Sequence, residues 1–191
     1  MKLTSCVALL AVVGGSLALS AGHAETPEEW IKLGARVHGG FGAFIPAGIR
    51  IGLDALERLK AEPRGVTVTF YSGEKAPCPC IADGVMLATQ ASPGQGTLQV
   101  APEKAPPGLL AVVIVRDRKS GAGVRYSISD EWMGKIADWN KALDPAGRYA
   151  AVLAAPGLFD VAAAPMTGLW RKGNTPWENA PDADSGVGNM V

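Results

Sequence analysis

The chain has 191 residues, and its 18 lysines and arginines equal its 18 aspartates and glutamates in number. A balanced charge without a basic cluster gives no electrostatic basis for binding nucleic acid, so we expect no nucleic-acid partner. The length is sufficient for one hydrophobic core and short for two domains.

The first 24 residues are typical of a secretory signal peptide. Lys2 gives the positive start, residues 6–19 form an apolar stretch, and small residues precede Glu25. This stretch is short and contains Gly and Ser, so it is a poor membrane span, although an uncleaved anchor is the alternative. Cys6 has no lipobox around it. We therefore expect a periplasmic or secreted protein with no stable membrane span after cleavage.

The mature part begins with a helix signal. Thr26 can cap a helix, Pro27 suits the first turn, and Glu29 completes a capping box. We expect this helix to end near Gly34 and the following turn to hold His38.

Two helices and a strand are predicted next. Apolar residues at helical spacing predict a helix over about residues 45–60, in which Gly48 and Gly52 would let another element approach closely. Alternating composition predicts a strand over residues 66–71. A short helix is then expected over about residues 81–90.

The rest of the domain is expected to contain three strands and then helices. The strands are predicted over residues 97–100, 109–116 and 124–129. The middle strand is apolar on both faces, which favours a central position. Asp130 is expected to cap the next helix, and a further helical stretch is expected from Gly147 to Ala155.

This order of elements favours an α+β fold, with helices packed on one mixed sheet. We assign the domain to residues 25–165 and a C-terminal tail to residues 166–191. The tail contains Trp170 and Trp177 and is expected either to lie against the domain as a strap or to be mobile.

Outside the signal, the only histidine and cysteine side chains are His38, Cys78 and Cys80. All three lie in Gly/Pro-rich turns. Imidazole and thiolate together suit zinc or copper, and three protein ligands leave an open coordination position. Asp83, one turn beyond Cys80, can act as a further ligand or orient His38. These four residues are the predicted metal site.

The two cysteines allow other interpretations. In an oxidising compartment they would normally suggest a disulfide, but a Cys-x-Cys ring stiffened by Pro79 is expected to be strained and easily reduced. The pair is therefore a redox dithiol, a ligand pair, or two cysteines of which one matters.

An enzyme is a further alternative, with Cys80 as thiolate nucleophile, His38 as base and Asp83 as orienting group. Backbone N–H groups of Gly94 and Gly96 would then bind an oxyanion or anionic ligand. The last alternative is a vestigial site in a partner-binding protein, with His38 hydrogen-bonded to a backbone carbonyl.

Two segments resemble the FmdE-like family, which takes its name from a component of formylmethanofuran dehydrogenase. Residues 37–50 align with an aromatic residue followed by His-Gly-His-x-Cys-Pro-Gly and Gly-Tyr-Arg. Residues 80–98 align with Cys-x-x-Asp-Ala-Ile-Gln and a later Thr-Gly-Cys-Thr-x-Gly-Lys-Gly-Asn-Leu. The resemblance extends over roughly residues 30–162. It implies an α+β fold like that of the glyceraldehyde-3-phosphate dehydrogenase catalytic domain, and no settled activity. It also makes a homodimer paired through the sheet one expected arrangement.

The chain departs from the family pattern at several ligand positions. Gly40 stands in place of the second family histidine and Gly42 in place of the first cysteine, while Cys78 is extra and can compensate for one lost ligand. The vacated positions predict an empty pocket beside His38 that can admit a small ligand. The candidate cofactor-binding residues are Gly40, Gly42, Gly94 and Gly96.

These observations favour an exported binding module that holds a transition metal, or a small metal-containing cofactor, for metal handling, sensing or delivery. Its expected partner is accordingly a metal ion or small ligand.

Overall fold

The computed structural model describes residues 25–164. The predicted signal peptide and the predicted tail with Trp170 and Trp177 lie outside the described residues, and both stay predictions. Within the described part, no helix combines the length and the apolar character that a membrane crossing requires.

The fold is α+β, as predicted, with five helices and one mixed five-stranded sheet among the described residues. The strands are β1 (Val66–Ser72), β2 (Leu98–Val100), β3 (Leu109–Asp117), β4 (Gly123–Ser129) and β5 (Asp160–Ala163). Their order across the sheet is β2-β1-β3-β4-β5. Strand β2 runs parallel to β1, and the other neighbours are antiparallel.

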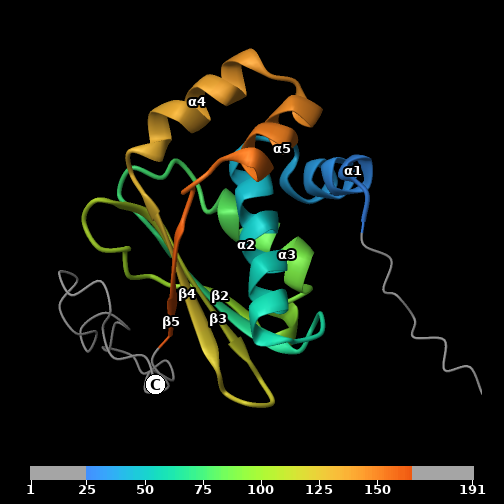
Figure 1. Cartoon of the computed structure of the whole chain (residues 1–191), viewed down its shortest axis with the longest axis vertical. Coiled ribbons are helices and arrows are strands. Elements are labelled where there is room, and N and C mark those ends of the chain that lie inside the picture. The colour runs from blue at the N-terminus through green and yellow to red at the C-terminus, as the bar shows by residue number, and fades with distance from the viewer. Residues whose placement is uncertain (1–24, 165–191) are drawn as a thin grey trace, which may run out of the picture.

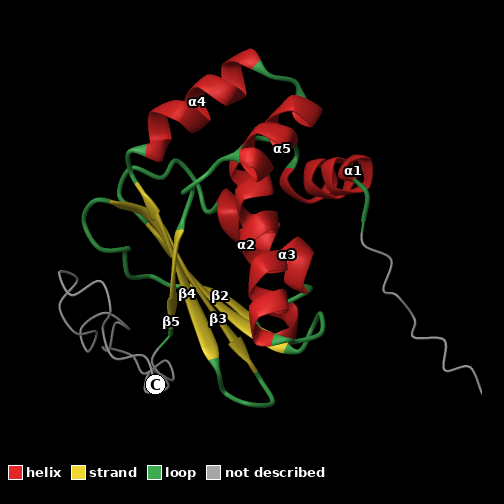
Figure 2. Ribbon diagram, viewed as in Figure 1, coloured by secondary structure: helices red, strands yellow, loops and turns green. Residues whose placement is uncertain are grey.

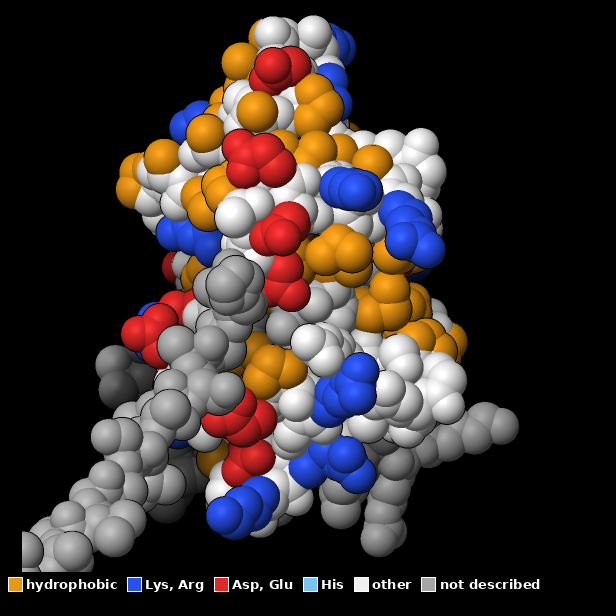
Figure 3. Space-filling view, turned by 90° about the vertical axis from the view of Figure 1, so that its right-hand side faces the viewer, with side chains coloured by type: hydrophobic (Ala, Val, Ile, Leu, Met, Phe, Trp, Pro, Cys, Tyr) orange, Lys and Arg blue, Asp and Glu red, His pale blue; other side chains and the backbone are white. Residues whose placement is uncertain are grey.

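The helices cover one face of this sheet (Figures 1 and 2). They are α1 (Pro27–His38), α2 (Phe44–Leu59), α3 (Cys80–Thr89), α4 (Trp132–Ala142) and α5 (Pro145–Ala154). Helices α2 and α3 pack side by side next to the strands, while α1 and α5 lie outside them. Acidic and basic side chains are interspersed on the face that carries α1 (Figure 3).

Strand β3 lies at the centre of the sheet, as its double-sided apolar pattern predicts. Val113 and Val115 belong to the main core under the helices. Val112 and Ile114 alternate with them and are buried in a smaller cluster with Tyr71. Both faces of β3 are therefore covered, which explains why the strand lacks polar positions between Leu110 and Val115.

Helix α1 begins as predicted, with the Thr26 capping box formed, but it does not end near Gly34. It continues to His38 and ends at Gly39, whose φ of 86° is left-handed. Gly34 instead makes room for Phe41, because a Cβ there would lie 2.6 Å from the Phe41 ring. The expected early end was wrong because this glycine serves close packing and does not terminate the helix.

Two further expectations on the helices need correction. Asp130 does not cap α4: the N-cap is Glu131, without a side-chain bond, and Asp130 forms an ion pair of 2.6 Å with Lys75. Helix α5 starts before Gly147, because the Asp144 side chain caps it by accepting a bond from the Gly147 N–H.

Strand β5 was not predicted. It pairs with β4 at the edge of the sheet, and most of its residues are exposed. It therefore lacks the alternation of apolar and polar residues by which a half-buried strand is recognised in a sequence.

Helices α2 and α3 pack closely against each other at glycine residues. The sequence predicted such a close approach at Gly48 and Gly52, which lie in α2. A Cβ on Gly48 would lie 2.1 Å from the Ile81 carbonyl oxygen, and a Cβ on Gly84 would lie 2.1 Å from that of Ile45. Each backbone thus occupies the space that a side chain would need on the other helix. This contact fixes where the first turn of α3 lies relative to α1 and α2.

We expect Gly48→Ala to lower the free energy of unfolding by about 2–3 kcal/mol, because the added methyl forces the two backbones apart. Urea unfolding followed by circular dichroism measures the change. Gly134→Ala in α4 is the matched control: nothing lies within 4 Å of its Cβ position, so it should be neutral or stabilising by up to about 1 kcal/mol. Equal effects of the two variants would contradict this account.

Candidate functional site

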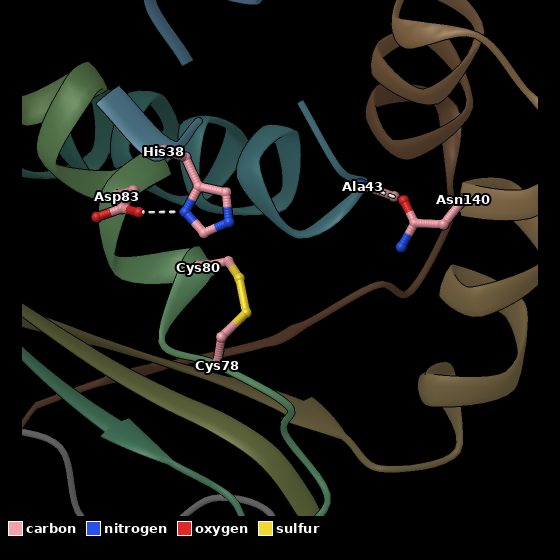
Figure 4. The surroundings of a disulfide bond; sticks show 6 residues. All are labelled: His38, Ala43, Cys78, Cys80, Asp83 and Asn140. Atoms are coloured by element: carbon pink, nitrogen blue, oxygen red, sulfur yellow. Dashed lines mark hydrogen bonds and ion pairs between the residues drawn. A yellow bond between two sulfur atoms is a disulfide. The ribbon is translucent and has the colours of Figure 1, made fainter. Parts of the chain in front are cut away.

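The imidazole of His38 is fixed by Asp83. His38 is the last residue of α1, and Asp83 lies in the first turn of α3. Their Nδ1 and Oδ2 atoms are 2.7 Å apart, with side chains 32% and 34% exposed. The other ring nitrogen, Nε2, is thereby turned away from Asp83 (Figure 4). The pair has the arrangement in which a carboxylate orients a histidine that acts through its second nitrogen.

Cys78 and Cys80 form a disulfide beside this histidine (Figure 4). Their Cα atoms are 5.4 Å apart, a separation that ordinary disulfides share, so the two-residue spacing does not prevent the bond. Cys80 begins α3 and is 6% exposed, whereas Cys78 lies half-buried in the turn before it. Of the predicted states of the pair, the structure contains the oxidised one.

The structure brings the three soft ligands together. The candidate ligand atoms of His38, Cys78 and Cys80 all lie within 4.8 Å of one another. Ligands of a tetrahedral zinc ion with two sulfurs are about 3.7 Å apart, so the group could hold a metal ion once the two sulfurs have separated. Disulfide sulfurs are not thiolates, and the pair must be reduced before both can ligate. The role of Asp83 as a direct ligand stays a prediction, because its observed partner is His38.

An open pocket of about 470 Å³ adjoins His38. It is lined by His38, Gly39, Gly40, Phe41, Gly42, Asn140 and Arg148. The predicted glycines Gly40 and Gly42 are therefore at the pocket. Gly94 and Gly96 are not among its lining residues; they lie at the short 3₁₀ turn Pro93–Gln95, beyond the other end of α3, and their binding role stays a prediction.

The pocket loop is held from outside by α4 and α5. Asn140 Oδ1 accepts a 2.8 Å bond from the Ala43 N–H. Arg148 donates to the Phe41 carbonyl at 3.1 Å and to the Asn140 carbonyl at 2.7 Å. No pattern in the sequence pointed to Asn140 and Arg148, because both act on backbone atoms and neither belongs to a motif.

The aromatic side of the loop is also anchored. Phe41 is 5% exposed and packs on Tyr149, with ring centroids 6.4 Å apart. Burial raises the pKa of the Tyr149 hydroxyl. The loop thus rests on an apolar contact on one side and on polar bonds to α4 and α5 on the other.

Comparison with known families finds a match over most of the domain. The model of the family described as "FmdE, Molybdenum formylmethanofuran dehydrogenase operon" matches residues 37–155. That range contains His38, both paired cysteines, Asp83 and the pocket residues of α4 and α5. Among curated proteins, none matches the chain.

We expect Asn140→Ala to expose the Ala43 N–H to exchange, because a buried amide would lose its acceptor at a cost of about 1–3 kcal/mol. Hydrogen exchange followed by NMR measures the protection of this amide. Asn140→Asp is the matched control, since it keeps an oxygen at the accepting position. Unchanged protection of Ala43 in Asn140→Ala would show that the bond does not hold the loop.

Proposed function

This chain belongs to the FmdE family, and we propose that it is a binding module that holds one transition metal ion at His38, Cys78 and Cys80. The observation that carries the proposal is the convergence of these three ligand atoms within 4.8 Å. Asp83 supports it by orienting His38, as carboxylates commonly do for histidine ligands.

The donor set points to a borderline or soft ion. Two thiolates and one imidazole suit Zn²⁺ or Cu⁺, and they disfavour Mg²⁺ or Ca²⁺, which prefer oxygen ligands. A metal held by three protein ligands keeps a fourth position for water or another molecule. Metal handling, sensing or delivery would use such an accessible site.

Metal binding would depend on the state of the two cysteines. A small dithiol can reduce the disulfide: it transfers two electrons and two protons, leaves two protein thiols and becomes a disulfide itself. Each thiol then loses its proton when it binds the ion. The oxidised form described here would be the metal-free form.

A second function is favoured by the same geometry. His38 lies between Asp83 and Cys80, so a reduced Cys80 would have a histidine nearby as base and a carboxylate that orients it. This enzyme would need only Cys80, whereas the metal site needs both cysteines. Cys78→Ser therefore separates the two: it should abolish stoichiometric metal binding and leave the reactivity of Cys80 toward iodoacetamide.

We also propose that the site works after export. The signal-like pattern over residues 1–24 supports this. Because an oxidising compartment favours the disulfide, metal binding there would require a dithiol reductant that opens it. Mass spectrometry of the protein purified from its own cells is the test. A chain beginning at Glu25 in the periplasmic or secreted fraction is expected, and an unprocessed cytoplasmic chain would overturn the proposal.

For the metal itself, we expect native mass spectrometry to find one zinc or copper ion per chain after anaerobic reduction. The oxidised chain should bind none and should weigh two hydrogens less than the metal-free dithiol form. His38→Ala and Cys80→Ser should lose stoichiometric binding. Absence of metal from the reduced chain at micromolar free zinc and copper would reject the proposal.

The contribution of Asp83 has its own control. Asp83→Asn should weaken metal binding by roughly 10–100-fold, as loss of a partner of a histidine ligand usually does. Asp138→Asn makes the same change at an exposed position of α4 and should leave the affinity unchanged. Equal affinities of the two variants would mean that Asp83 does not support the site.

A further inference from the structure

The pocket beside His38 has hydrogen-bond donors and a positive charge, and no carboxylate of residues 25–164 is among its lining residues. We propose that it binds a small organic anion through a carboxylate or phosphate group. This inference goes beyond the metal proposal and does not rest on it, because the donors are present in the oxidised, metal-free chain.

The positive charge comes from Arg148. Its Nη1 and Nη2 atoms donate to carbonyl oxygens, which carry no formal charge. Its Nε is buried without a hydrogen-bond partner. None of the salt bridges within residues 25–164 includes this guanidinium. The guanidinium of Arg148 in the pocket wall is therefore not paired with any carboxylate of the described chain. An anionic ligand would compensate its positive charge.

The loop adds backbone donors. Across the described segment, no hydrogen bond is donated by the N–H groups of Gly40, Phe41 or Gly42. These three successive N–H groups are therefore available to a ligand that contacts the loop. Asn140 contributes as well: its Oδ1 is occupied by Ala43, so its amide NH₂ group is the part left to meet a ligand (Figure 4).

The open pocket has room for an organic anion. A volume of about 470 Å³ lies within the range of small-molecule sites and exceeds the needs of a single inorganic ion. Gly39 and Gly40 leave open space where side chains would stand, since nothing lies within 4 Å of either Cβ position. The glycines thus leave the space that the ligand would occupy. The positive charge of Arg148 and the amide donor of Asn140 would favour an anion in that space.

The experiment is an NMR titration of the ¹⁵N-labelled, oxidised, metal-free chain at constant ionic strength. The probes are malonate, methyl phosphate and, as a cation of similar size, choline. We expect saturable shifts of the Gly40, Phe41 and Gly42 amides with at least one anion and none with choline. The anion that binds more tightly identifies the group as carboxylate or phosphate. No saturation with either anion, or equal shifts with choline, would overturn the proposal.

Two variants test the assignment to this pocket. Gly40→Leu should fill the space without disturbing the bonds of Arg148, and it should weaken anion binding at least tenfold. Asn140→Asp keeps the acceptor for Ala43 but replaces the donor with a negative charge, and it should weaken binding at least as much. Gly134→Leu is the matched control, because its Cβ position is also open but lies outside the pocket.

Wild-type affinity in either pocket variant would reject the assignment, and so would an equal loss in Gly134→Leu. The outcome is independent of metal binding, which is measured on the reduced chain. Failure of one proposal therefore leaves the other standing.

Discussion

The site depends on the glycine contact between α2 and α3. At Gly48 and Gly84 the two helix backbones come closer than any pair of side chains would permit. This contact sets the position of the first turn of α3, and that turn carries Cys80 and Asp83. Because α2 follows the His38 loop directly, the same contact brings the end of α1 to the start of α3. The histidine, the cysteines and the carboxylate meet because two helices can pack without side chains between them.

The resulting centre can have its two sulfurs joined as a disulfide or separated as thiols, and only one of these states can exist at a time. With the sulfurs joined, His38 and Asp83 form a polar pair beside a pocket that has a net positive wall. With the sulfurs separated, the same histidine would be one of three ligands for a soft ion under our proposal. Cys80 begins α3 and Cys78 lies only two residues before it, so both candidate sulfur ligands come from one short segment. The covalent state of two atoms would therefore decide what the site can hold.

The sequence contained most of this architecture. The apolar periodicity of residues 45–60 and the continuous apolar run of β3 predicted a packed helix and a central strand, because burial imposes those patterns locally. The candidate ligands were visible because so few histidines and cysteines exist, and their proximity followed from the family resemblance. Asn140 and Arg148 were not predictable: they contact backbone atoms of a loop about 100 residues away, and such contacts leave no pattern in either segment. Strand β5 was missed because an exposed edge strand needs no alternation.

The way in which the loop is held has a consequence for how this family can diverge. Asn140 and Arg148 hydrogen-bond the segment after His38 only at backbone groups, namely the Ala43 N–H and the Phe41 carbonyl. Its shape is consequently insensitive to most of the side chains it carries, apart from Phe41, which is packed in the interior. A side chain at Gly40 would meet open space, and one at Gly42 would make only ordinary contact with Asn140. Substitutions at these two positions can therefore change the chemistry beside His38 while the backbone of the loop keeps its shape.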